Sequence, residues 1–218
     1  MTRTIAGPTI QLLEIGAGHG EEIRARSGEQ WTALVPIRGG FAWRTGVVTV
    51  RKIVDEVVDA ANEKTGKEVR FPGTSPVFLV RGWDLPLGSV QTSFSTSREP
   101  GAIGTAIFTD PIALKLKGID YRLRVTYRRD DDHSAKQRSD LVLERGEARQ
   151  ILYSWPDGLR DERCELIWAG DLDGDGGLDL YLYLSDHYNV IEHTLFRSRG
   201  AATGKMVMQV ARWVTTGC

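Results

Sequence analysis

An acidic, glycine-rich stretch in the C-terminal third constrains the fold of this 218-residue chain more than any other segment. It runs from Trp168 to Leu180 and reads WAGDLDGDGGLDL. Four carboxylates lie in it, at Asp171, Asp173, Asp175 and Asp179. Calcium takes six to eight oxygen ligands, and carboxylates spaced by two in a tight turn supply them. Like charges held this close repel one another strongly, so the stretch predicts a bound cation, and calcium fits best.

The residues on either side of the acidic stretch have the pattern of β-strands. Residues 178, 180, 182 and 184 are leucines that would share one face, while Tyr181 and Tyr183 would lie on the other. Residues 164–168 also have the composition of a short strand. An EF-hand loop would have helical flanks and a glutamate at its twelfth position, where this chain has Leu182. The prediction is therefore a strand–loop–strand metal site.

A D-x-D-G-D-G-x-x-D loop between two strands resembles the calcium loop of FG-GAP and VCBS-type repeats, which occur in integrin α-subunit propellers. The resemblance covers only residues 167–184, and the motif occurs once. It implies five calcium ligands, namely the side chains of Asp171, Asp173, Asp175 and Asp179 and the carbonyl of Gly177. Because no segment repeats at the period of a blade, a propeller is not expected. The alternative interpretation is an acidic hairpin without an ion.

The rest of the chain predicts many short strands separated by turns. The clearest is residues 119–128, where apolar odd positions alternate with polar even positions, as in a strand with one buried face. Further strands are expected at about 9–15, 31–35, 47–50, 77–80, 89–94, 112–116, 137–144, 147–153, 190–196 and 205–215. This spacing predicts a mainly β fold, an antiparallel sandwich or barrel-like domain. We expect one domain over 1–218, with a looser N-terminal part over about 1–105 beside a calcium-loop part over about 106–218.

Three segments leave alternatives open. Residues 53–64 have apolar positions that fit one face of a helix, yet their β-branched content favours a strand. Residues 95–104 form a long loop whose conformation the sequence does not decide. Residues 12–20 read LLEIGAGHG and resemble the first motif of methyltransferases that use S-adenosylmethionine. That motif needs a following helix, which Gly28 interrupts, so a strand and a glycine-rich turn are the favoured interpretation.

Composition and the two cysteines bear on partners and compartment. The net charge of −1 argues against nucleic-acid and anionic-membrane partners, and no apolar run has the length of a membrane span. The first residues lack the apolar region of a signal peptide, although a leader can be removed. Neither Cys164 nor Cys218 has a CxxC partner, so a disulfide between them is favoured over a redox or metal-binding thiol. Calcium and a disulfide together predict a periplasmic or secreted protein.

No catalytic motif is recognisable, so the sequence favours a non-enzymatic role. Neither a G-x-S-x-G elbow nor an H-E-x-x-H helix is present, and the histidines are not spaced as metal ligands. We expect a calcium-stabilised binding module that engages another protein or a glycan, possible forms being an inhibitor or an immunity-type protein. The alternative is a hydrolase of glycans or cell walls that uses Asp186 and Glu192 as its carboxylates. A row of arginines at Arg122, Arg124 and Arg128 would either grip an acidic partner or face solvent.

Overall fold

The protein is all-β wherever its structure is described. A computed structural model describes residues 9–95, 105–106, 110–129, 137–159 and 164–216. In these ranges every regular element is a strand and every strand pair is antiparallel. The mainly β, antiparallel fold predicted from the sequence is therefore confirmed. The described part of the chain contains no helix with the length and apolar character needed to cross a membrane.

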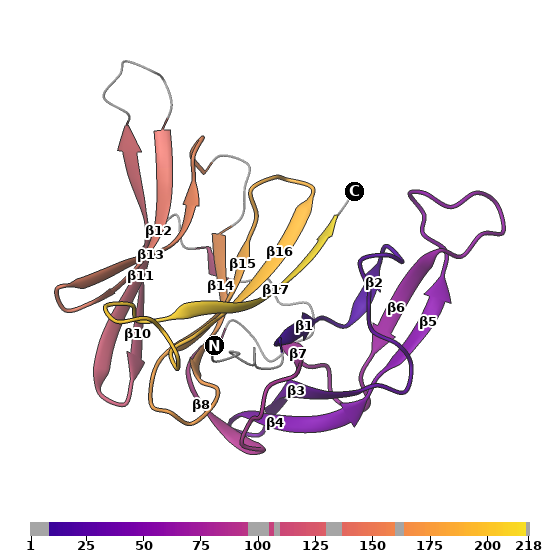
Figure 1. The fold of residues 1–218 in the computed structure, drawn as a ribbon, viewed down its shortest axis with the longest axis horizontal. Coiled ribbons are helices and arrows are strands. Elements are labelled where there is room, and N and C mark those ends of the chain that lie inside the picture. The colour runs from indigo at the N-terminus through magenta and orange to yellow at the C-terminus, as the bar shows by residue number, and fades with distance from the viewer. Residues whose placement is uncertain (1–8, 96–104, 107–109, 130–136, 160–163, 217–218) are drawn as a thin grey trace, which may run out of the picture.

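The largest sheet curls into a nearly closed barrel (Figure 1). Its strands follow one another in space as β1 (Gln11–Leu13), β7 (Phe78–Arg81), β3 (Gln30–Ile37), β4 (Gly40–Val47), β8 (Gly88–Ser95), β14 (Cys164–Asp171), β15 (Asp179–Leu184), β16 (Val190–Arg197) and β17 (Met208–Thr216). The short β9 (Thr105–Ala106) pairs with β14 outside this order. Since β1 also lies against β17, the two ends of the sheet approach each other.

Two smaller sheets pack on opposite sides of the barrel, which lies between them in Figure 1. One sheet contains β10 (Ile112–Leu116), β11 (Ile119–Arg129), β12 (Gln137–Arg145) and β13 (Ala148–Trp155) in sequence order. The other contains β2 (Gly16–Gly18), β6 (Gly66–Arg70) and β5 (Thr49–Ile53) in that spatial order. The acidic stretch identified in the sequence belongs to the barrel, at the connection between β14 and β15.

Strand β15 is buried on both faces because it separates two hydrophobic cores. Leu180, Leu182 and Leu184 pack toward the four-stranded sheet, where they meet side chains such as Leu141 and Trp155. The remaining face contributes Tyr181 to the barrel interior. The interior is aromatic, with Phe41, Trp43, Phe78 and Trp168 around that tyrosine. The alternation predicted for this strand is confirmed. The strand is apolar on both sides because each of its faces lies in one of the two cores.

Most strands predicted from local pattern are present, but residues 53–64 are neither helix nor extended strand. Strand β5 ends at Ile53, and residues 54–65 form a loop of turns before β6 begins. The apolar side chains that suggested a buried face are exposed there, Val54, Val57 and Val58 among them. The apolar spacing therefore does not indicate burial in this segment. The loop exposes these valines to solvent, and no core covers them in the described structure.

The glycine-rich segment after β1 also differs from the expected turn. Residues Gly16–Gly18 form strand β2, paired with β6, and no helix follows them in the described chain. A cofactor loop of the methyltransferase kind needs a helix packed on a parallel sheet, and the described sheets are antiparallel. The predicted loop at 95–104 lies almost wholly outside the described residues.

The arginine row on β11 lies on the face of the four-stranded sheet that points away from the core. Arg124 donates to Glu144 at 2.8 Å, and Arg128 donates to Asp140 at 2.5 Å. Asp140 is buried and also contacts Arg138 at 3.2 Å. These arginines therefore have carboxylate partners within their own sheet, which is how a solvated charged face is usually arranged.

Candidate metal centre

The acidic loop connects two neighbouring barrel strands, as the sequence predicts. Asp171 is the last residue of β14 and Asp179 is the first of β15, and the two strands pair up to Gly170 and Asp179. Leu172 is buried in the barrel interior, whereas Leu178 is buried against the four-stranded sheet. Because each end of the loop is held in a different core, the intervening residues have little freedom to move apart.

Glycines give the loop its tight path. Gly176 has φ of +88°, a left-handed conformation that side chains disfavour. At Gly177 the limit is space, because an added Cβ would lie 2.5 Å from Ser198 Cβ. Ser198 follows β16, so the loop packs directly on the end of the next strand. The glycines therefore allow the loop to fold back over its own carboxylates.

Three of the four predicted carboxylates meet at one point. Asp171, Asp173 and Asp179 are buried, and one oxygen from each lies within 4.8 Å of the others. Asp171 is 5% exposed, and its Oδ1 is buried with no hydrogen-bond partner. A buried carboxylate oxygen without a donor is costly, so a cation bound beside it would stabilise it. The residues present suit a small hard cation with oxygen ligands.

Backbone donors hold Asp179 in position. Leu172 N donates to Asp179 Oδ2 at 2.7 Å, and Ser198 N donates to Oδ1 at 2.8 Å. Burial raises the pKa of Asp179 to about 7, and the negative charge of Asp173 adds to this effect. The backbone hydrogen bonds oppose the rise, since they favour the charged form. The charge of this carboxyl therefore depends on what else occupies the cluster.

Asp175 has a different set of contacts. Its Oδ1 accepts a hydrogen bond from Gly177 N at 2.7 Å and another from Ser198 Oγ at 3.0 Å. It is not part of the group formed by the other three carboxylates. The structure therefore brings together three of the five predicted ligands, and the contributions of Asp175 and of the Gly177 carbonyl stay predictions.

Basic side chains from other strands surround the cluster, which the sequence analysis did not anticipate. Lys117 Nζ lies 2.9 Å from Asp171 Oδ2, and Arg197 Nε lies 2.7 Å from Asp173 Oδ2. Arg199 Nε is 3.7 Å from both Asp173 and Asp175. Part of the counter-charge that the carboxylates need thus comes from the protein itself. When all four carboxylates are charged, these three cations leave one negative charge, so a divalent ion would bind in competition with nearby basic groups.

The two carboxylates considered for hydrolysis lie elsewhere. Asp186 follows β15, and Glu192 is on β16, so both are at the opposite end of β15 from Asp179. Five residues of extended strand separate the ends, about 17 Å. Glu192 is buried, which raises its pKa, and the nearby charge of Asp186 acts in the same direction. The charges of Asp186 and Glu192 thus influence each other, but both residues are separate from the acidic loop.

A second polar cluster, also missed from the sequence, crosses the barrel interior. Tyr181 donates its hydroxyl to Glu14 Oε1, and His193 Nδ1 lies 3.0 Å from the same oxygen. The His193 ring stacks on Trp213, with centroids 5.9 Å apart. Glu14 comes directly after β1, so this cluster joins the first strand to β15, β16 and β17. It lies where the ends of the barrel sheet meet, and sequence spacing gives no sign of it.

The predicted disulfide stays a prediction. Cys164 is buried with a free thiol, its pKa is raised by burial, and Cys218 lies outside the described residues. Strands β15 and β16 separate Cys164 from β17, the last described strand. Three strand spacings amount to about 14 Å, beyond the reach of a disulfide. Whether Cys164 and Cys218 are bridged is therefore decided by residues beyond Thr216, outside the described part of the chain.

Comparisons with known proteins give no further assignment. Neither the protein-family models, nor the curated proteins, nor the solved structures that were searched gave a match to this chain. The likeness of the loop to FG-GAP and VCBS-type repeats therefore rests on residues 167–184 alone.

Proposed function

We propose that this protein is a calcium-stabilised, non-enzymatic binding module that works in the periplasm or outside the cell. The observation that carries the proposal is the group of three buried carboxylates, in which Asp171 Oδ1 has no donor. A set of candidate ligands made only of carboxylate oxygens suits calcium better than transition metals, which prefer nitrogen and sulfur ligands. Calcium is abundant outside the cytoplasm, so a moderate affinity would keep the site filled there.

In this proposal calcium acts on stability rather than on chemistry. The carboxylates are buried, and they connect strands that also contribute to two cores. A ligand that binds only the folded state stabilises it, by roughly 2.7 kcal/mol when its concentration is 100 times the dissociation constant. The ion would fix the β14–β15 connection and so support a rigid scaffold. Rigid scaffolds suit proteins that block a partner, such as inhibitors and immunity proteins, because they lose less conformational entropy on binding.

The test is thermal unfolding of the wild type with excess EGTA and with millimolar calcium. We expect a higher midpoint in calcium and one bound calcium per chain by equilibrium dialysis. Asp171→Asn should remove most of the difference between the two conditions, because it removes charge at the oxygen that lacks a donor. Asp120→Asn is the matched control, since that side chain is 79% exposed on β11. Identical wild-type curves with and without calcium would refute the calcium site.

The alternative function is a hydrolase that uses Asp186 and Glu192. The burial that raises the pKa of Glu192 favours it, because a raised pKa is the direction of shift that a carboxyl group needs to act as a general acid. Turnover of glycan or cell-wall substrates that is lost in Glu192→Gln would support this alternative. Because the pair lies at the other end of β15, its activity should not respond to Asp171→Asn.

A further inference from the structure

The loop between β5 and β6 exposes three valines to solvent. Val54, Val57 and Val58 are 49%, 57% and 64% exposed. Figure 1 shows this loop extending beyond the ends of the two strands. Single exposed apolar residues are common, but three within five residues of one projecting loop are a concentration that suits a protein interface.

Hydrogen bonds within the loop keep these valines in a fixed arrangement. Asp59 Oδ2 accepts from Asp55 N at 2.7 Å and from Thr65 N at 2.9 Å. Asp55 in turn is paired with His19, which lies after β2. Since the backbone is already ordered, binding through this loop would lose little conformational entropy. The valines are therefore presented to solvent by a preorganised loop.

The loop is also strongly acidic. Residues 54–65 contain four acidic residues and one lysine, a net charge of −3. Glu56 and Glu63 are exposed beside the valines. An occupant of this surface must therefore offer apolar contact together with positive charge.

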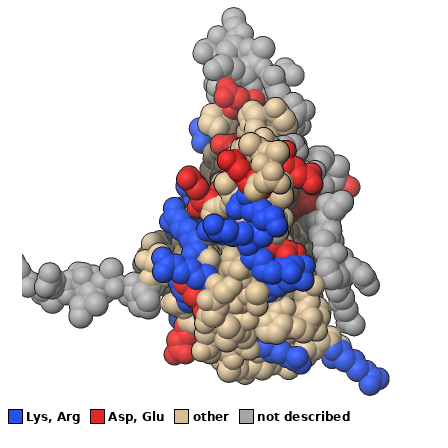
Figure 2. Space-filling view, turned by 90° about the vertical axis from the view of Figure 1, so that its right-hand side faces the viewer, with Lys and Arg blue, Asp and Glu red and all other residues tan. Residues whose placement is uncertain are grey.

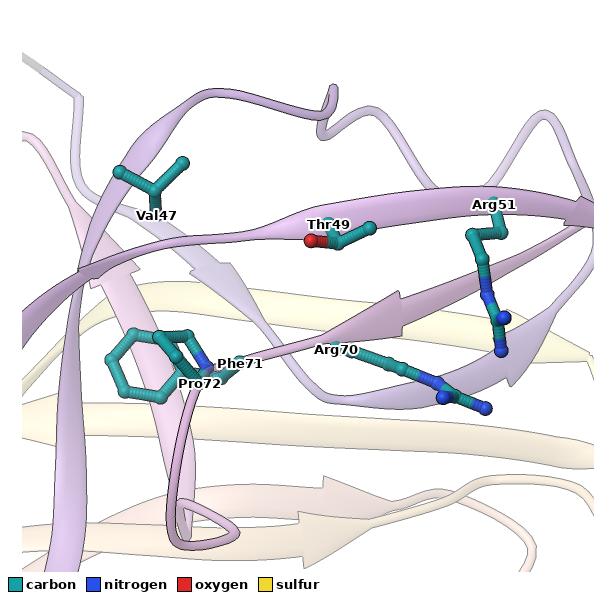
Figure 3. Close-up of a pocket in the computed structure, with 6 residues that line it drawn as sticks. All are labelled: Val47, Thr49, Arg51, Arg70, Phe71 and Pro72. Carbon is teal, nitrogen blue, oxygen red and sulfur yellow. The ribbon is translucent and has the colours of Figure 1, made fainter.

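A groove with that combination lies on the same small sheet. It has a volume of about 300 Å³ and is lined by Val47, Thr49, Arg51, Arg70, Phe71 and Pro72 (Figure 3). Its apolar side chains lie at one end, and the side chains of Arg51 and Arg70 extend from different strands into the other end. Both arginines bond to Glu68, at 2.7 and 2.9 Å, which leaves this group with one net positive charge. The groove therefore complements the loop both in apolar contact and in charge.

Strand β5 connects the two features, so both lie on one side of the molecule. Arg51 is on β5, and Val54 follows the end of that strand directly. Figure 2, which views this side, shows a band of Lys and Arg side chains with Asp and Glu side chains gathered above it. Two complementary patches next to each other on one face are what a two-fold symmetric interface requires, because each copy then offers both.

We propose that two copies of this chain associate through this face, with the valine loop of each copy seated in the arginine groove of the other. Val57 and Val58 would contact Phe71 and Pro72 of the second copy. Glu56 and Glu63 would meet Arg51 and Arg70. Strand addition is not the mode of contact, because Ser27 Oγ already bonds both the N–H and the carbonyl of Val50 on the outer edge of β5. The interface does not depend on calcium.

Sedimentation equilibrium of the purified protein in EGTA tests the proposal. The chain has a mass of 24.2 kDa, and we expect the weight-average mass to rise toward twice that value with concentration. High salt should weaken the association, since the Debye length falls to about 3 Å at 1 M. Val57→Ser with Val58→Ser should weaken dimerisation at least tenfold, and it alters no ion pair. A wild type that stays monomeric at high concentration and low salt would overturn the proposal.

A charge exchange makes the test specific to this geometry. Arg51→Glu with Arg70→Glu, and separately Glu56→Arg with Glu63→Arg, should each give monomers. A one-to-one mixture of the two variants should dimerise again, because both contacts of the symmetric pair are then complementary. Arg122→Glu with Arg145→Glu makes the same change of charge on exposed positions of the other small sheet and should leave the dimer intact. A mixture that stays monomeric, or a control that also dissociates, would count against the proposal.

Discussion

Lys117 Nζ lies 2.9 Å from Asp171 Oδ2, although 54 residues separate the two in sequence. The lysine sits in the tight turn between β10 and β11, with φ of +48°, and Asp171 ends β14. The four-stranded sheet therefore supplies a positive charge to the acidic loop of the barrel. Without a metal ion this lysine is the main counter-charge for Asp171, and a bound cation would have to share or displace it.

Replacing Lys117 should lower stability in the absence of calcium and enlarge the stabilisation that calcium gives. In EGTA, Lys117→Met should destabilise the protein by about 1–2 kcal/mol, because a buried carboxylate loses a charged hydrogen-bond donor. In calcium, the ion meets less competition, so the increase in stability on adding calcium should be larger than in the wild type. Urea unfolding in both conditions measures this. Lys115→Met is the control, since Lys115 is 69% exposed and contacts only the exposed Asp120 among its described ion pairs. If calcium raised the stability of Lys117→Met only as much as it raises that of the wild type, Lys117 would not compete with calcium for Asp171.

The raised pKa of Asp179 predicts a pH dependence of the metal-free protein. In the unfolded chain this carboxyl titrates near 4, and in the folded protein near 7. The folded state therefore binds the proton more tightly between these values, so stability should fall as pH rises from about 4 to about 7. The Asp179→Asn variant lacks this titratable carboxyl group, so it serves as the reference. In EGTA, the stability of the wild type relative to Asp179→Asn should fall across that window, and a flat difference would contradict the assignment.

The same titration predicts how calcium binding responds to acid. A cation binds the charged carboxylate, so protons compete with calcium once the pH falls below the folded pKa of Asp179. Calcium affinity measured by titration calorimetry should therefore weaken progressively below about pH 7. Affinity that stays constant down to pH 5 would show that Asp179 does not exchange a proton on binding.

The acidic loop and its strands were predictable because they depend on neighbouring residues. The spacing of Asp171, Asp173 and Asp179 set the turn, and the alternation of Leu180 with Tyr181 set the faces of β15. Each of these signals lies within a dozen residues, where backbone geometry alone relates sequence to position. The mainly β class followed from the same local patterns, repeated along the chain.

Features that depend on contacts between distant residues were not predictable. Nothing near Lys117 in the sequence indicates that it reaches Asp171, and nothing near Glu14 indicates His193. The valines at 54–58 were ambiguous for a related reason. Their spacing fits a buried face, but burial depends on which other element covers them, and in this fold none of the described elements does. Tertiary context therefore decided each of these positions.

The pair of His19 and Asp55 predicts a second pH effect, which arises from a histidine rather than from a carboxyl group. Hydrogen bonding to Asp55 raises the pKa of His19, and the charge of Glu22 contributes in the same direction. A histidine with a raised folded pKa stabilises the protein below its unfolded value near 6.5, and this contribution is lost as pH rises through the folded pKa. Stability should therefore fall above pH 6.5 in the wild type, and less so in His19→Gln. His187→Gln, at an exposed position, is the control.

The cluster around Glu14 predicts non-additive effects on stability. Tyr181→Phe removes the hydroxyl that bonds Glu14, and a lost hydrogen bond to a charged group typically costs about 1.5–3 kcal/mol. Glu14→Gln removes the charge that both Tyr181 and His193 contact, so the second change should cost less once the first is made. Urea unfolding of the two single variants and the double variant gives the coupling energy. Tyr188→Phe is the control, because Tyr188 is 77% exposed. Strictly additive losses would show that Glu14 does not connect the end of β1 to β15 through Tyr181.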